Sequence, residues 1–477
     1  MAALSIRPEL IAAGGVVLLV ALGVGLRNWR WSLYGLLCYL PVSGIAILAA
    51  YPGRTDRAVA ILAKDFVFVI PAYVGFLVYF WSRRRPFWFK GAPLVLFGLL
   101  ALIVVIQGFN PDLKNHLVGL IGIKVWLFYV PLFFLGYHLV ETRGQLFRVL
   151  GGMTLLAIVP AVIGLAEVAL YYTGHVQTVY DAYGGAVNAA TQNKTTFILS
   201  HGCTIRRVPS TFSFFYQYYL FATAMVVIAF AWWRGSRPPG RQLRIGGVLF
   251  LLMLLAAMFS GVRLAFVLIP LVVLAMILLG MRSVNRLPWA IVAIGAVCFA
   301  IAAGAGAATC GVGQHLAEAT GGEKETVVTH SVGQAVHKTW LGLGAGSDST
   351  GARYAFPNNQ LETVTGAVQE AWYVKTYLEL GVFGLAIVLA LLITILVRAF
   401  RIHQRLRDPR LKMVSAGIIA FMGFVLVYNA KAQYFDLDPT NVYFWLFAGL
   451  LMGLPRLDRA SPEAEPEPEL ERVPAEV

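Results

Sequence analysis

The sequence predicts an all-α polytopic membrane protein with about 12–13 transmembrane helices. Of its 477 residues, 58% are apolar and only 13% are charged, whereas about a quarter of the residues of a soluble chain carry a charge. The mean hydropathy is +0.72, and apolar runs of about twenty residues, the length that crosses a bilayer, recur along the chain. We therefore expect a single transmembrane domain over residues 1–460.

The apolar runs give the candidate spans in order. The first run lacks a small-x-small cleavage site and leads directly into another span, so we expect it to stay in the protein as a helix. The tail over 461–477 alternates Glu and Pro, and we expect it to be a disordered cytoplasmic segment. The spans lie near residues 9–26, 31–50, 59–81, 91–107, 117–140, 146–172, 211–233, 245–259, 262–281, 288–308, 371–398, 412–429 and 441–454.

The distribution of Lys and Arg predicts the orientation of the spans. One set of alternate loops carries 23 of these residues and the other, much longer set carries 12, and cytoplasmic loops are the ones enriched in Lys and Arg. The long loops 173–210 and 309–370 are then outward-facing, to the periplasm or cell exterior, and we expect 309–370 to be partly helical. Because the net charge of +14 resides mainly in these loops, it indicates topology signals and contact with anionic lipid, and no nucleic acid.

Three ionisable residues stand inside the early spans. Lys64 and Asp65 are adjacent, and adjacent helical residues point about 100° apart, so they need not pair. We expect both to reach the nearby interface rather than to serve a function. Lys124 lies roughly 12 Å into its span, and the sequence leaves open whether it faces a functional site.

Two cysteines fall in outward loops. Cys203 ends the loop 173–210 and Cys310 begins the loop 309–370. The outer side of the membrane permits oxidation, so the two are a candidate disulfide between the loops, and the sequence cannot give their separation.

Outward-facing cations gather near two of the spans. Arg206 and Arg207 end the loop 173–210, and Arg263 lies in a turn of a few residues. Guanidinium groups pair with phosphate oxygens through two hydrogen bonds and stay charged at every relevant pH. We expect these arginines to bind a lipid-linked phosphate or pyrophosphate, with Lys124 and Lys338 as further candidates.

Glu370 is the candidate catalytic residue. It stands where the loop 309–370 meets the next span, and ionisable groups at membrane depth are costly and usually functional. A carboxylate beside a bound pyrophosphate suits general-base catalysis on a hydroxyl acceptor, while the arginines offset the charge of the departing pyrophosphate. The competing interpretation is an ion pair of Glu370 with a nearby cation. For Lys375 and Glu379, four residues apart on one helix, we expect a structural salt bridge.

The large loop shows neither a metal site nor a phosphate-binding loop. His330 and His337 share a helix face, but a metal would need further ligands, and His337 is therefore given only a supporting role. The run Gly342-Leu343-Gly344-Ala345-Gly346 lacks the Gly-Lys-Ser/Thr of a P-loop and reads as a flexible turn. We expect no metal and no other cofactor.

Several short motifs resemble those of the O-antigen ligase and O-antigen polymerase superfamily. Arg207-Val208-Pro209-Ser210-Thr211-Phe212 is similar to its Arg-x-x-Gly-Thr-Phe motif, with Ser210 in place of Gly, and Ser260-Gly261-Val262-Arg263 to its Ser-Arg turn. The run from Trp340 to Gly346 resembles its Gly-x-Gly stretch. The segment from Glu370 to Gly384 fits its His-Asn-x-Tyr-Leu…Glu-x-Gly-x-x-Gly segment, with Tyr373, Glu379, Gly381 and Gly384 in register.

The resemblance implies a membrane glycosyltransferase of the bacterial inner membrane that acts on undecaprenyl-pyrophosphate-linked glycans at the outer face. Glu370 occupies the place of the ligase histidine, which favours a polymerase of capsular or exopolysaccharide type, with Tyr373 in support. An O-antigen ligase or a protein O-oligosaccharyltransferase is the alternative, and a transporter of lipid-linked sugars is the second alternative. The expected partners are the glycan donor and acceptor, membrane lipids and other polysaccharide assembly proteins.

Overall fold

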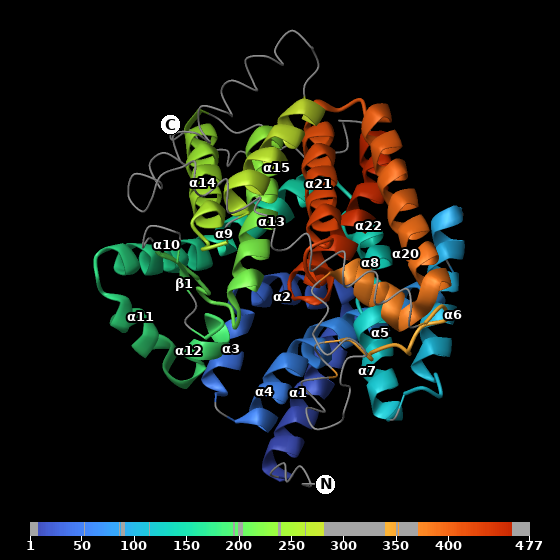
Figure 1. Cartoon of the computed structure of the whole chain (residues 1–477). Helices are drawn as coiled ribbons and strands as arrows, with labels where there is room; N and C mark the ends of the chain where they lie inside the picture. The colour runs from blue at the N-terminus through green and yellow to red at the C-terminus, as the bar shows by residue number, and fades with distance from the viewer. Residues whose placement is uncertain are drawn as a thin grey trace, which may run out of the picture.

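The computed structural model describes residues 8–51, 53–84, 86, 91–113, 115–193, 196–198, 204–236, 240–262, 264–280, 339–349, 352 and 371–459. Helices make up most of this part of the chain (Figure 1), which confirms the predicted all-α class. Several predicted residues lie outside the described ranges, namely Cys203, Arg263, Cys310, His330, His337, Lys338, Glu370 and the tail 461–477.

Seven described helical segments are long and apolar enough to cross a membrane, and four shorter apolar helices accompany them. The protein is therefore a multi-pass membrane protein. The seven are Trp29–Ala49, Asp56–Ser82, His116–Leu139, Arg143–Tyr172, Phe215–Gly235, Trp372–Arg405 and Pro409–Tyr428. The shorter four are Gly14–Arg27, Ala92–Gly108, Ile245–Met258 and Ala265–Gly280.

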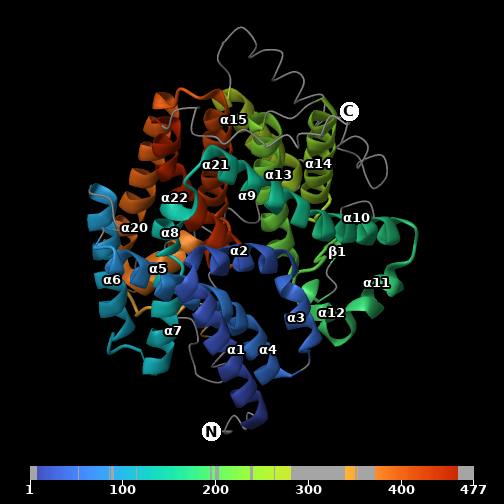
Figure 2. The same cartoon turned by 180° about the vertical axis from the view of Figure 1, so that it is seen from behind.

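The N-terminal helices lie together at the end of the molecule where the chain begins (Figures 1 and 2). Two of the predicted spans are interrupted. A 3₁₀ turn over Leu40–Val42, which contains Pro41, separates two helices, and a π-helical turn over Asp65–Val69 separates two more. The helices are α1 (Pro8–Arg27), α2 (Trp29–Tyr39), α3 (Ser43–Ala49), α4 (Arg54–Lys64) and α5 (Ile70–Ser82).

The middle of the chain also breaks its spans. The break between α7 and α8 contains Pro131, which has no N–H for a helical hydrogen bond. The polar loop 173–210 includes two short helices and a two-stranded antiparallel hairpin that pairs Thr196 with Arg206. The elements are α6 (Ala92–Gly108), α7 (His116–Leu127), α8 (Leu132–Leu139), α9 (Arg143–Leu156), α10 (Ile158–Tyr172), α11 (Val176–Tyr183), α12 (Val187–Ala190), β1 (Thr196–Ile198) and β2 (Thr204–Arg206).

Two helices, α13 and α21, form the packed centre. The span of α13 is 83% buried and that of α21 is 72% buried, against about 40% for the more peripheral spans. Figures 1 and 2 show α13 and α21 between α14 on one side and α20, α22 and α8 on the other. The helices are α13 (Phe215–Gly235), α14 (Gly240–Met258), α15 (Ala265–Gly280), α20 (Trp372–Arg405), α21 (Pro409–Tyr428) and α22 (Thr440–Arg459).

Polar contacts join loops within each of the two predicted sets. Arg30 pairs with Glu141, and Arg143 pairs with Asp408 at 3.1 Å. These contacts join three loops of the set predicted to be cytoplasmic. Loops of the other set meet elsewhere, where Val208 N–H donates to the Ser260 carbonyl (3.3 Å).

Candidate active site

The Gly-x-Gly stretch packs against a break in α20. Gly381, inside α20, has φ 73° and ψ −174°, a conformation that favours glycine. The break leaves backbone N–H and C=O groups of α20 without helical hydrogen bonds, and the Gly-x-Gly stretch bonds to them. Val382 N–H donates to Trp340 O (3.0 Å), and Leu343 N–H donates to Leu378 O (2.7 Å). Gly342 has φ 95°, and a Cβ there would lie 2.7 Å from Gly381 N. The two glycine motifs are therefore glycine-rich because their backbones touch.

The same stretch is held on its other side by α6 and α7. Ala345 N–H donates to Gln107 O (2.9 Å), and the Gln107 side chain donates to Leu341 O. A Cβ at Gly346 would lie 3.1 Å from the Gly122 Cα in α7. The prediction of a flexible turn here is wrong, because residues 340–348 are clamped between α6, α7 and α20.

A buried polar cluster lies beside this clamp, and we call Trp126, Asp348, Lys375, Glu379 and Asp436 the α20 cluster. Lys375 has a fully buried side chain and forms an ion pair with Asp436. Glu379 accepts from Trp126 Nε1 (2.6 Å) and from Asp348 N–H (3.0 Å). The predicted salt bridge between Lys375 and Glu379 is wrong, since each side chain takes a partner from a distant segment.

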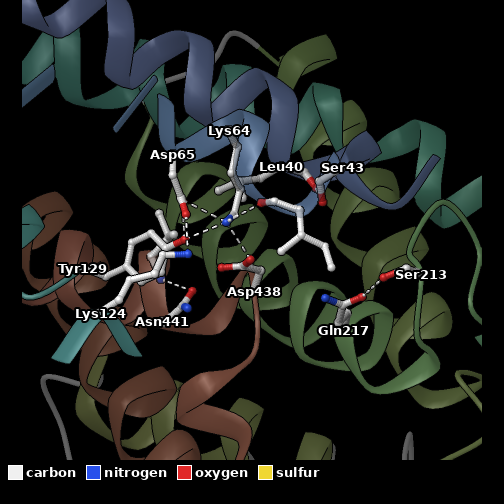
Figure 3. A network of polar contacts seen from close by, with 12 residues as sticks. Leu40, Ser43, Lys64, Asp65, Lys124, Tyr129, Ser213, Gln217, Asp438 and Asn441 are labelled. Carbon is white, nitrogen blue, oxygen red and sulfur yellow. Dashed lines mark hydrogen bonds and ion pairs between the residues drawn. The ribbon is translucent and has the colours of Figure 1, made fainter. Parts of the chain in front are cut away.

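A second buried network, the α4 cluster, consists of Lys64, Asp65, Lys124, Tyr129 and Asp438 (Figure 3). Lys64 Nζ lies 3.0 Å from Asp65 Oδ1 and 2.9 Å from Asp438 Oδ2, and Lys124 Nζ lies 2.8 Å from Asp65 Oδ2. Tyr129 Oη lies 2.6 Å from both Lys64 Nζ and Asp65 Oδ1. The expectation that Lys64 and Asp65 reach the interface is wrong, because both are buried and paired.

Two short segments supply residues to both clusters. The α7 segment contributes Lys124 to the α4 cluster and Trp126 to the α20 cluster. The loop 430–440 contributes Asp438 to the first and Asp436 to the second. Neither aspartate was identified from the sequence. The sequence does hold a signal for them: this short outward-facing loop carries two acidic residues, and three lysines inside spans need acidic partners.

The Arg206–Arg207 pair lies at the end of the loop 173–210. Arg207 is 8% exposed; its guanidinium carbon lies 4.4 Å from the centre of the Phe215 ring, and Nη1 donates to Gln192. Arg206 Nη1 donates to the Tyr180 hydroxyl (2.8 Å). Arg207 therefore lies against a ring at the start of α13, whereas the guanidinium carbon of Arg206 lies 5.7 Å from the centre of the Tyr171 ring in α10.

The segments that carry the two arginine motifs are in contact. Besides the hydrogen bond from Val208 N–H to Ser260 O (3.3 Å), a Cβ at Gly261, whose φ is 79°, would lie 2.8 Å from the Arg207 Cα. Arg263 comes two residues later in the chain, outside the described residues. The Arg-x-x-Ser-Thr-Phe segment and the Ser-Gly turn thus meet at one place.

Tyr373 has a structural contact of its own, because its hydroxyl donates to Leu426 O (2.7 Å) in α21.

Among the described residues there is no group of three or more His, Cys, Asp and Glu side chains arranged to hold a metal. The other predicted site residues lie in ranges that the structure does not describe.

The fold and these clusters define a polytopic membrane protein with charged networks buried between its helices. Residues 248–389 match a family model described as O-antigen ligase. This match supports the O-antigen ligase and polymerase superfamily of membrane glycosyltransferases, as the sequence motifs predicted. It includes the Ser-Gly turn, the Gly-x-Gly stretch and the break at Gly381. A search of curated proteins finds no match.

Proposed function

We propose that this protein is a polysaccharide polymerase that joins undecaprenyl-pyrophosphate-linked oligosaccharide units at the outer face of the cytoplasmic membrane. In this proposal Arg207 and Arg263 hold the donor pyrophosphate, assisted by Arg206 and Lys338. Glu370 is the general base, with His337 and Tyr373 in support.

The observation that carries the proposal is the contact between the two arginine motifs. Residues 206–208 and 260–261 are about fifty positions apart in sequence, yet they touch through their backbones. In this proposal the Arg263 guanidinium lies beside that of Arg207, and two such groups would suit a pyrophosphate, which offers several oxygens to bidentate donors. The family match adds the reaction class, glycosyl transfer.

The chemistry needs a proton acceptor and a stabilised leaving group. A hydroxyl oxygen of the acceptor sugar attacks the anomeric carbon of the donor and loses its proton to the Glu370 carboxylate. The bond between the anomeric carbon and the phosphate oxygen breaks, and its electron pair leaves with the lipid pyrophosphate. The arginines stabilise the charge that develops on this pyrophosphate, in place of a metal ion.

The test is chain extension by the purified protein in vesicles that contain lipid-linked repeat units. The wild type should produce a ladder of longer glycans. Arg207→Lys and Arg263→Lys should lose most activity because an ammonium cannot replace the planar fork, and Glu370→Gln should lower turnover by roughly 10²–10⁴-fold. Arg234→Lys is the matched control, since Arg234 lies in the last turn of α13, at the opposite end of that helix from Arg207. Full activity of the Arg207 and Arg263 variants would refute the proposal.

A ligase is the second candidate, because the matching family model is described as an O-antigen ligase. A ligase would transfer one glycan to a lipid A core or a protein acceptor and would give no ladder with lipid-linked units alone. Supplying each acceptor separately to the same vesicles distinguishes the two reactions.

A further inference from the structure

Glu167 is a carboxyl group buried next to the Arg207 motif and not used in the proposed reaction. It lies in α10 with 7% of its surface exposed. Its Oε1 lies 2.6 Å from the Tyr183 hydroxyl, and its Oε2 accepts the Ser210 N–H at 3.3 Å. Within the described part of the chain no Lys, Arg or His forms an ion pair with it.

The hydrogen atoms available at this point do not suffice for an ionised Glu167. The Tyr183 hydroxyl lies 2.6 Å from Glu167 Oε1 and also 2.8 Å from the Ser210 carbonyl oxygen. A tyrosine has one O–H to donate, and both of these neighbours are acceptors if Glu167 is a carboxylate. Burial raises the pKa of Tyr183 far above its usual range, so the phenol keeps its proton.

A protonated Glu167 satisfies every contact. Its O–H donates to the Tyr183 oxygen, the Tyr183 O–H donates to the Ser210 carbonyl, and the second Glu167 oxygen accepts the Ser210 N–H. The alternative, a buried carboxylate without a cationic partner, is much more costly than a hydrogen-bonded neutral acid. Hydrogen counting and solvation thus favour the same form.

The three hydrogen bonds hold Ser210 in an unusual conformation. Ser210 has φ 53°, which is uncommon for a residue other than glycine. Its hydroxyl donates a further hydrogen bond to the Pro160 carbonyl (2.7 Å), so residues of α10 bind both the backbone and the side chain of Ser210. Ser210 comes three residues after Arg207, and these hydrogen bonds therefore fix the turn that follows the arginine.

We propose that Glu167 is a positioning residue that works as a neutral acid: with Tyr183 it locks the Ser210 turn and so places Arg207. Because the acid is uncharged, it stabilises the turn without offsetting the positive potential of Arg206 and Arg207. An ionised carboxylate at the same place would compete with a phosphate for the arginines. The consequence for activity rests on the proposed function, whereas the protonation state does not.

Infrared spectroscopy tests the protonation directly. The difference spectrum between wild type and Glu167→Gln, recorded at neutral pH with ¹³C-labelled glutamate, should show the C=O stretch of a protonated carboxyl group in the wild type. Carboxylate bands in place of that stretch would overturn the proposal. This readout needs no substrate and decides the point even if the protein proves not to be a polymerase.

Activity tests the positioning role. The Gln amide can donate to Tyr183 and accept from Ser210, so Glu167→Gln should extend chains at close to the wild-type rate. Glu167→Ala removes both contacts, and a misplaced arginine should lower activity by about 10²-fold. Tyr183→Phe keeps the ring and removes the hydroxyl that bonds Glu167 and Ser210, so its activity should lie between those of the Gln and Ala variants. It provides a second test should the alanine variant misfold. A folded Glu167→Gln protein as inactive as Glu167→Ala would show that the charge of Glu167 is required, and the proposal would fail.

Discussion

The ion pair between Lys375 and Asp436 attaches the loop 430–440 to α20, and its removal should cost much stability. The Lys375 side chain is fully buried, and that of Asp436 is 14% exposed. Removing one partner of a buried pair leaves the other charge uncompensated, at a cost of about 3–5 kcal/mol. Lys375→Met should lower the free energy of unfolding by about that amount. The variant also removes the electrostatic attraction of Lys375 for the buried Glu379, which places the expected value towards the upper end.

A double variant separates loss of the pair from loss of packing. Lys375→Met combined with Asp436→Asn removes both charges, and uncharged replacements of a buried pair are often neutral or better. The part of the loss caused by the unpaired Asp436 should therefore return, whereas the part caused by Glu379 should not. Glu141→Gln is the control, because Glu141 forms an exposed pair with Arg30 and should cost at most about 1 kcal/mol.

Unfolding in detergent, followed by tryptophan fluorescence during a denaturant titration, measures these differences. Trp126 and Trp372 lie beside the pair and are two of the eleven tryptophans that contribute to the signal. The reasoning is refuted if Lys375→Met is as stable as the wild type, or if the double variant is no more stable than the single one.

Three further predictions concern the backbone and the chemistry. Gly381→Ala should destabilise the protein and abolish activity, since its Cβ would lie 2.5 Å from the Leu341 carbonyl carbon at a φ of 73°. The control Gly98→Ala, at an open helical site, should stabilise the protein by up to about 1 kcal/mol. Equal thermal stability of the two variants would contradict this prediction. Ser210→Gly should keep activity and Ser210→Val should lose it, because φ is 53° and a β-branched residue is strained there; the rate of chain extension per folded protein measures both. EDTA should not slow chain extension, and a loss that magnesium or manganese restores would show that the reaction needs a metal.

The features predicted well from sequence depend on local composition. The all-α membrane class and the glycine motifs follow from hydropathy and spacing, which each segment carries by itself. The pairing of Lys64 and Asp65 could not be predicted, because it depends on the π-helical turn that begins at Asp65 and on Asp438, far along the chain. Lys375 likewise takes Asp436 in place of Glu379, although Glu379 has the favourable helical spacing. The choice between partners depends on how the helices pack, and no single segment encodes it.

Lys124 has two candidate roles, which are to balance the charge of Asp65 in the α4 cluster and to bind the donor pyrophosphate. The cluster holds two lysines and two aspartates, and Lys124, with 36% of its side chain exposed, pairs with an Asp65 that is almost completely buried. If Lys124 mainly balances Asp65, Lys124→Met leaves a buried carboxylate with one lysine fewer and should destabilise the protein by a few kcal/mol. The further change Asp65→Asn should then restore stability and activity together. If Lys124 binds the donor pyrophosphate, the double variant should be stable yet inactive. The distance of 2.8 Å from Lys124 Nζ to Asp65 Oδ2 favours the first outcome. A double variant that is stable but extends no chains would refute it.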